Sequence, residues 1–176
     1  MLNRLFLSGA VVLLSAAQGC SALGQVGFDV TSHGTSTIPG GSLVNLSGTP
    51  FAGFSNVNFS QSQDFTNNNT NKDHVSSARL SGFTLKVTSP SGQDLSFLTS
   101  ISFKIKSSAM GPVEIAHRES FPKGQTSIDL ILDDVELAPY VKADSFTITT
   151  DAQGQSPAQS TDVEADLTLH ISASVL

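Results

Sequence analysis

Three observations predict that this chain folds as an all-β protein, an antiparallel, Ig-like β-sandwich. Only 14% of its 176 residues are charged, while Ser, Thr, Asn and Gly are abundant, as is usual in exported β proteins with many turns. Apolar residues recur at spacing two through most of the chain, which places them on one face of a strand. Frequent Gly and Pro turn signals separate these runs. We therefore expect a single β domain over residues 25–176.

The alternating runs predict strands at 26–30, 57–59, 83–87, 97–105, 113–115, 128–132, 146–148 and 163–175. Two turn signals separate some of them. Ser-Pro-Ser-Gly at 89–92 predicts a hairpin turn, and Gly111-Pro112 predicts a second turn. No segment has a clear helical stripe, and only the stretch 134–143 is expected to hold one short helical turn.

The last run is the most regular, because apolar and polar residues alternate without exception from Val163 to Val175. Thirteen residues at about 3.3 Å each would span roughly 43 Å, which exceeds the usual strand of about 3 to 10 residues. We expect a bend, a bulge or a change of sheet within it.

The first nineteen residues have the anatomy of a signal peptide. Arg4 is the single cation, residues 5–17 are apolar, and small residues precede Cys20. An apolar run of this length is too short for a transmembrane helix, which needs about 20 residues. Residues 1–19 are therefore expected to be a leader.

The tetrapeptide at 17–20, Ala-Gln-Gly-Cys, resembles the lipobox of bacterial lipoproteins. Gly19 and Cys20 match that pattern, whereas Ala17 and Gln18 depart from it. The resemblance implies that Cys20 accepts lipid, including palmitate, and that residues 20–24 form a short tether at the membrane. Ser21 then implies sorting to the outer membrane. The alternative is ordinary cleavage after Ala22, which would give a soluble periplasmic or secreted protein.

Other segments carry further resemblances. Residues 51–56, 72–75 and 121–126 are similar to the uncharacterised lipoproteins of myxobacteria and their relatives, a resemblance that implies no particular activity. The order of an Ile-Pro-Gly turn at 38–40, Pro-Ser-Gly-Gln at 90–93 and Lys-Gly-Gln-Thr at 123–126 more distantly resembles late-embryogenesis-abundant-type Ig-like domains. That resemblance implies a small sandwich without catalytic residues.

No motif for catalysis is present in the sequence. There is no Gly-x-Ser-x-Gly elbow, and the one cysteine, Cys20, belongs to the lipobox. The four histidines are scattered and form no metal-binding spacing, so we predict surface or turn histidines, namely His33, His74, His117 and His170. We therefore expect no enzyme activity, no cofactor and no metal.

The densest acidic group consists of Asp129, Asp133, Asp134 and Glu136. These carboxylates could supply oxygen ligands to calcium, but their spacing lacks the Asp-x-Asp-x-Asp-Gly pattern that wraps one ion. A solvated acidic edge that discourages pairing between sheets is the simpler interpretation.

Four phenylalanines, Phe51, Phe54, Phe59 and Phe65, lead into a polar stretch at 67–73. Aromatic residues beside an adaptable loop could form a binding surface. Because the chain has no Trp and one Tyr, the same phenylalanines could instead supply the bulk of the core.

The net charge of −6 excludes a general nucleic-acid-binding role. The expected function is a non-enzymatic envelope lipoprotein whose sandwich binds another envelope protein or is structural. The alternative is a carrier that holds a lipid or another apolar ligand between its two sheets.

Overall fold

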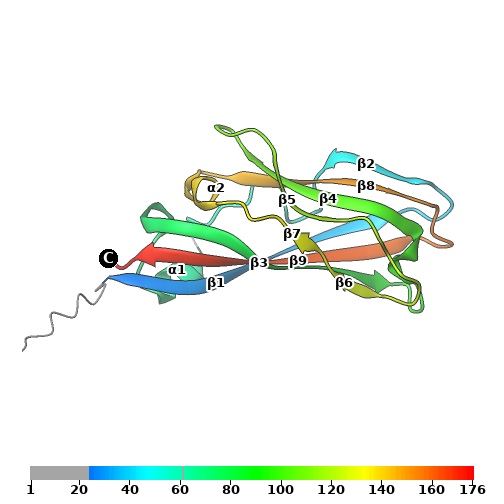
Figure 1. Ribbon diagram of the computed structural model, residues 1–176, viewed down its shortest axis with the longest axis horizontal. Helices are drawn as coiled ribbons and strands as arrows, with labels where there is room; N and C mark the ends of the chain where they lie inside the picture. The colour runs from blue at the N-terminus through cyan, green and yellow to red at the C-terminus, as the bar shows by residue number, and fades with distance from the viewer. Residues whose placement is uncertain (1–23, 61) are drawn as a thin grey trace, which may run out of the picture.

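Two antiparallel sheets lie face to face in the computed structural model, which describes residues 24–60 and 62–176 (Figure 1). In the first sheet the strands lie in the order β1-β9-β3-β6. Their bounds are Gln25–Ile38 for β1, Thr161–Ser174 for β9, Val75–Ser89 for β3 and Ser127–Asp129 for β6. The predicted all-β antiparallel sandwich is confirmed.

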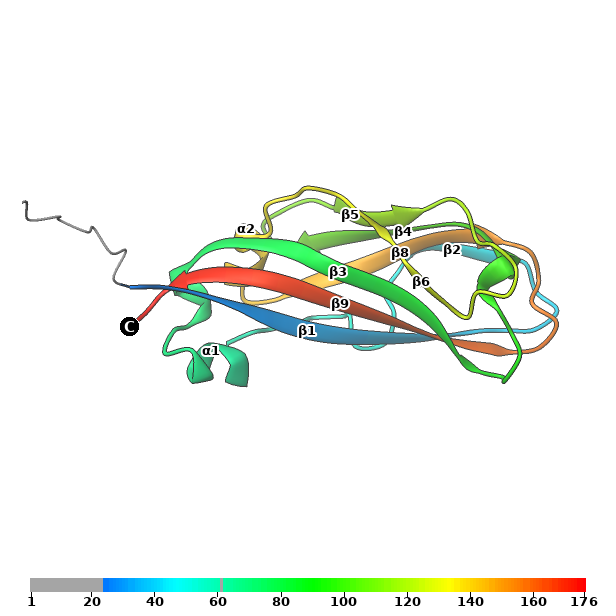
Figure 2. The ribbon, with the colours of Figure 1, turned by 60° about the horizontal axis from the view of Figure 1, so that its bottom comes forward.

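The second sheet has the order β2-β8-β4-β5-β7. Its strands are β2 (Val44–Thr49), β8 (Phe146–Gly154), β4 (Leu98–Ser107), β5 (Val113–Arg118) and β7 (Ile131–Leu132). Figure 2 shows how strongly the first sheet twists along its length. The leader and Cys20 lie outside the described residues.

Short helices lie at the connections. They are α1 (Gln63–Asn67), α2 (Ala138–Lys142) and two 3-10 turns, Lys72–His74 and Leu95–Phe97. Helix α2 confirms the predicted helical turn at 134–143, whereas α1 was not predicted because its single buried residue, Phe65, leaves no periodic stripe. In the described part of the chain, every helix is too short to cross a membrane.

Strand β9 runs unbroken in one sheet, so the predicted change of sheet in the last run is wrong. Every residue of β9 has a partner in β1, from Thr161 opposite Ile38 to Ser174 opposite Gln25, without a shift of register. The irregularities fall on its other neighbour, where β3 carries three extra residues, Ser76, Ser81 and Thr88. The bulge expected within the last run is therefore located in its partner strand instead, where it increases the local twist.

Three local predictions are corrected. The run 57–59 is not a strand, because only Val57 makes a bridge, to Phe146. The turn at 89–92 is not a hairpin, since it joins β3 in one sheet to β4 in the other. The run 128–132 splits between the sheets, with β6 in the first and β7 in the second, so the chain changes sheet at Leu130.

The core lies between the sheets and is centred on aromatic rings. Phe54, Phe83 and Phe103 are fully buried, and the centroids of the Phe83 and Phe103 rings are 4.5 Å apart. The Phe54 ring lies directly over Gly34 of β1, where an added Cβ would be 2.7 Å from the ring. Glycine is therefore required at position 34 for β1 and this ring to pack together.

One buried hydroxyl interrupts the apolar core. Thr150 in β8 is fully buried. Among the described side chains, its Oγ1 is the one buried nitrogen or oxygen atom that has no hydrogen-bond partner. Thr70 is a matched contrast, because it is also buried but its Oγ1 donates to the carbonyl of Ser174 at 2.6 Å. An unpaired buried hydroxyl costs free energy, whereas a paired one stabilises the fold.

We therefore predict that Thr150→Val raises the free energy of unfolding by about 1 kcal/mol, because it removes an unpaired hydroxyl and keeps the shape. Thr70→Val, the matched control, should lower it by about 1 kcal/mol. Urea denaturation followed by circular dichroism measures both values. Destabilisation by Thr150→Val would show that the hydroxyl has a partner in solution.

Candidate functional site

The four phenylalanines of the possible binding surface lie in the core. Phe51, Phe54, Phe59 and Phe65 are each at most 7% exposed. Their side chains therefore do not form an exposed aromatic surface, and of the two interpretations burial supports the one in which they supply core volume. The physical reason is the composition, because without Trp these rings are the largest apolar groups that can fill the space between the sheets.

The rings contact one another in two groups. Phe51 and Phe54 meet Phe103 with centroid distances of 5.5 and 6.4 Å, and Phe59 and Phe65 lie 6.2 Å apart. The T-shaped and tilted arrangements are those that aromatic quadrupoles favour. Rings thus occupy the space in which the carrier alternative would place an acyl chain.

Truncation of a core ring should be costly. We predict that Phe54→Ala lowers the free energy of unfolding by about 3 to 5 kcal/mol through lost burial and a residual cavity. The control is Leu43→Ala, where the native side chain is 77% exposed and the change should be within about 0.5 kcal/mol. Chemical denaturation checks both, and a mild effect at Phe54 would contradict its place in the core.

The predicted acidic group does not form one site. Asp129 accepts a hydrogen bond from Thr84 at 2.7 Å, and Asp134 pairs with Arg79. Glu136 accepts a hydrogen bond from the backbone N–H of Ala138 at the start of α2, and Asp133 Oδ2 lies 3.4 Å from Nδ1 of His117. Arg79 also lies 3.8 Å from Glu136, so Asp134 and Glu136 share this cation, while Asp129 and Asp133 have partners of their own. The four carboxylates therefore do not converge on one calcium ion.

Glu136 ties β3 to α2. Its Oε1 accepts hydrogen bonds from the backbone N–H of Ala78 at 2.7 Å and of Ala138 at 3.0 Å, and its Oε2 accepts one from Ser77. Burial raises the pKa of Glu136, but these hydrogen bonds and the nearby Arg79 guanidinium outweigh it, and the net pKa lies below the ordinary 4.5. The ionised form is the one that holds α2 against the sheet.

A lowered pKa in the folded state makes this contribution depend on pH. The stabilisation by Glu136 is complete above pH 4.5 and is lost as pH falls through the lower folded-state pKa. We predict that Glu136→Gln destabilises the protein at pH 7 by less than about 1 kcal/mol, since the side chain is 40% exposed. Denaturation at pH 7 and pH 3 should show this difference closing in acid, and a difference that widens in acid would contradict it.

The histidines lie at the surface, as predicted, but His117 is only partly exposed. His33 pairs with Asp166 and His170 with Asp29, each directly across the β1–β9 pair. His74 pairs with Asn71 in the turn before β3. His117, in contrast, lies beside two carboxylates.

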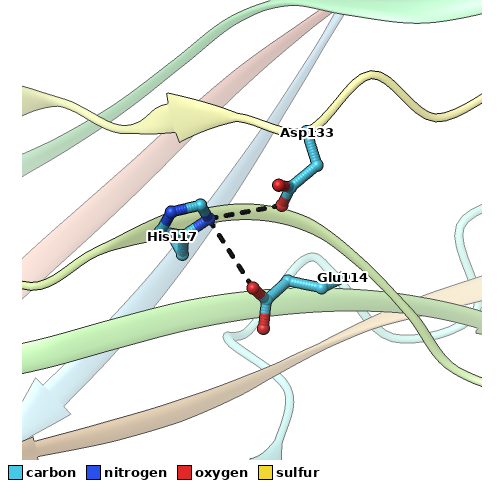
Figure 3. A group of neighbouring side chains, drawn as sticks. All are labelled: Glu114, His117 and Asp133. Atoms are coloured by element: carbon cyan, nitrogen blue, oxygen red, sulfur yellow. Dashed lines mark hydrogen bonds and ion pairs between the residues drawn. The ribbon is translucent and has the colours of Figure 1, made fainter.

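Glu114, His117 and Asp133 form a cluster on the outer face of the second sheet, shown in Figure 3. The Nδ1 atom of His117 is 3.6 Å from Oε1 of Glu114 and 3.4 Å from Oδ2 of Asp133. One donor atom from each residue lies within 4.8 Å of those of the other two. We call these three residues the Glu-His-Asp cluster.

A β-bulge in β5 creates the cluster. In a regular strand, residues three apart point to opposite faces, so Glu114 and His117 would be separated. Here Phe103 pairs with Ala116 and the next residue, Lys104, pairs with Glu114, which leaves Ile115 as an extra residue. Ile115 and Ala116 are both buried, and Glu114 and His117 therefore share the outer face.

The same bulge positions Asp133. The backbone N–H of Asp133 donates to the carbonyl of Ile115 at 3.0 Å, immediately after β7 pairs with β5. Bulges are common beside functional sites because they redirect side chains. The sequence signal for this bulge is the apolar pair Ile115-Ala116, which interrupts the alternation of polar and apolar residues. The pair alone does not show on which face of the sheet the neighbouring polar side chains lie.

An open groove of about 320 Å³ lies beside the cluster and crosses β5, β4 and β8. Glu114 and His117 line it together with Glu119 and Asp151, and the remaining polar lining comes from Ser100, Ser102 and Gln153. Neither lysine nor arginine is among its lining residues. The groove therefore presents an excess of carboxylates to solvent.

Lys104, which lies opposite Glu114 in the β4–β5 pair, is hydrogen-bonded to a groove residue. Lys104 Nζ donates to Asp151 at 2.6 Å, and this hydrogen bond raises the pKa of Lys104 and lowers that of Asp151. Asp151 also accepts from the backbone N–H of Gly48, which lowers its pKa further. Lys104 thus donates its hydrogen bond to Asp151, and its positive charge acts on Glu114, the residue opposite it in β5, only as a weaker contribution.

No protein-family model matches this chain, and a sequence search of curated proteins finds no match.

Proposed function

We propose that this chain is a lipid-anchored protein of the cell envelope whose β-sandwich is a non-enzymatic binding or structural domain. The observation that carries the proposal is the spacing between the lipobox cysteine and the fold. Strand β1 begins at Gln25, so residues 21–24 alone separate it from Cys20. A lipid on Cys20 would hold the sandwich within roughly 17 Å of the bilayer surface, because each residue spans at most about 3.5 Å.

The strand directions then give the attached domain an orientation. β1 leads away from the tether over fourteen residues, about 46 Å at 3.3 Å each. β9 and β3 follow the same long axis, and the loops at 39–43, 90–94, 119–126 and 155–160 gather at the end opposite the start of β1 (Figure 2). We call these the distal loops. They are the part of the domain that an anchored sandwich offers furthest from the membrane.

Hydrogen bonds brace the distal loops against one another. Asp94 accepts from the Ser96 hydroxyl at 2.7 Å and from the Gly124 N–H at 2.6 Å, and Gly41 N–H donates to the carbonyl of Pro157. The hydrogen bonds from Ser96, then Gly124, lower the pKa of Asp94. Leu43, which is 77% exposed, projects from this braced end. Such preorganised loops suit a contact with another envelope protein, because little ordering entropy is then lost on binding.

We predict that the wild-type protein, expressed in a Gram-negative host, partitions with membranes and into detergent, and that Cys20→Ala abolishes this partitioning. Several acyl chains give stable attachment, at about 0.8 kcal/mol for each buried methylene. Mass spectrometry of the mature N-terminus measures the modification directly. It should find an acylated Cys20 in the wild type.

The matched variant for this experiment is Gln18→Ala, which brings the lipobox closer to the bacterial pattern and should raise the acylated fraction. An unmodified N-terminus at Leu23 would overturn the proposal and favour a soluble periplasmic or secreted protein.

A further inference from the structure

We propose that the Glu-His-Asp cluster binds one divalent first-row transition-metal ion, for which Zn²⁺ is the representative. Glu114 and Asp133 would each supply a carboxylate oxygen and His117 its Nδ1 atom. This site is independent of the anchor, since it depends on no residue before β4.

The spacing of the donor atoms fits such an ion. Zinc bonds to imidazole nitrogen and carboxylate oxygen are about 2.0 to 2.2 Å long, so two ligand atoms at a tetrahedral angle lie about 3.4 Å apart. The distances from His117 Nδ1 to the two carboxylates are 3.4 and 3.6 Å. Small side-chain rotations would bring the third pair, which lies within 4.8 Å, to the same separation.

The charges favour a dication over a simple ion pair. A protonated imidazole carries one positive charge, whereas the cluster has two carboxylates, and Glu119 lines the same groove. Arg118 donates to the carbonyls of Ser120 and Asp129, and Lys104 donates to Asp151, so neither cation forms a hydrogen bond with the cluster. Lys104 acts on Glu114 through its charge alone. Two positive charges on one metal ion would balance the two ligand carboxylates.

The ligand types select the kind of metal. Imidazole nitrogen suits zinc, copper, iron and nickel, whereas calcium prefers a shell of oxygen atoms alone. The three side chains are 32% to 42% exposed, so the groove leaves room for water to complete the coordination. The site should therefore bind Zn²⁺ well and Ca²⁺ poorly.

The backbone holds the three ligands in place before any metal binds. Glu114 and His117 flank the bulge in β5, and the N–H of Asp133 is tied to the carbonyl of Ile115 within that bulge. The ligands thus come from two hydrogen-bonded segments in the ordered sheet, and little reorganisation is needed on binding.

Isothermal titration of the untagged, chelator-treated protein, expressed from its complete coding sequence, tests the proposal with ZnCl₂ and CaCl₂. One equivalent of Zn²⁺ should bind with micromolar or tighter affinity, and Ca²⁺ should bind at least tenfold more weakly. His117→Ala, Glu114→Gln and Asp133→Asn should each weaken Zn²⁺ binding by about tenfold or more. Titration with Co²⁺ adds a spectroscopic readout, since its visible absorption should be altered by His117→Ala.

The matched control is His170→Ala. His170 also lies beside one aspartate, with Nδ1 2.8 Å from Asp29, but among the described residues no third metal-ligating group joins that pair. Zn²⁺ affinity should be unchanged in this variant. Absence of one-to-one binding in the wild type, or equal losses in His170→Ala and His117→Ala, would overturn the proposal. Circular dichroism confirms folding, and if one ligand variant fails to fold the other two still decide the outcome.

Discussion

The pairing of β9 with two long neighbours is the interaction on which the rest of this sandwich depends. All fourteen residues of β9 pair with β1, and β3 lies along its other edge. Its inward side chains, from Val163 to Ala173, are all buried, while the residues between them remain at least partly exposed. Because a shift of one residue would exchange these two sets, burial of one face fixes the register. That register places β1 beside β9 and so brings the start of β1 next to the end of β9.

Departures from regular pairing shape the rest of the molecule. Three extra residues in β3 let it follow β9 while the sheet twists, and the chain leaves the first sheet at Leu130 to begin β7 in the second. One extra residue in β5, Ile115, gathers Glu114 and His117 on one face. Regular pairing thus builds the core, and irregular pairing builds the candidate site. This division is expected, because bulges cost ladder hydrogen bonds and are retained where they redirect a side chain.

The parts of the fold that were predictable from sequence are those encoded by local alternation. The alternation from Val163 to Val175 predicts a strand with one buried face, and the same pattern identifies part of β1, β3 and β8 and most of β4. Pairing is not local, so the sequence did not reveal that the 89–92 turn joins different sheets or that the run 128–132 divides between them. Val57 illustrates this limit of sequence-based prediction. Its apolar pattern is typical of a strand, but its backbone forms only an isolated bridge to Phe146.

The candidate site escaped prediction for the same reason. Counted along the sequence, the four histidines are isolated and Asp133 belongs to an acidic run with Asp134 and Glu136. In the fold that run separates, since Glu136 binds backbone N–H groups at α2 while Asp133 is held against β5. Only the combination of a bulge and a change of sheet brings Asp133 to His117. Neither event has a spacing rule that could be applied to the sequence alone.

The two outer faces show what the bulge changes. On the first sheet, regular antiparallel register matches each histidine with one carboxylate: Asp29 lies opposite His170 and Asp166 opposite His33. In each such pair, one imidazolium would match one carboxylate, so no additional cation is needed to neutralise the pair. On the second sheet, the extra residue at Ile115 places His117 between Glu114 and Asp133, so that one imidazole faces two carboxylates. The same residue types therefore form separate pairs where the register is regular, and a cluster of three converging side chains where one residue is inserted.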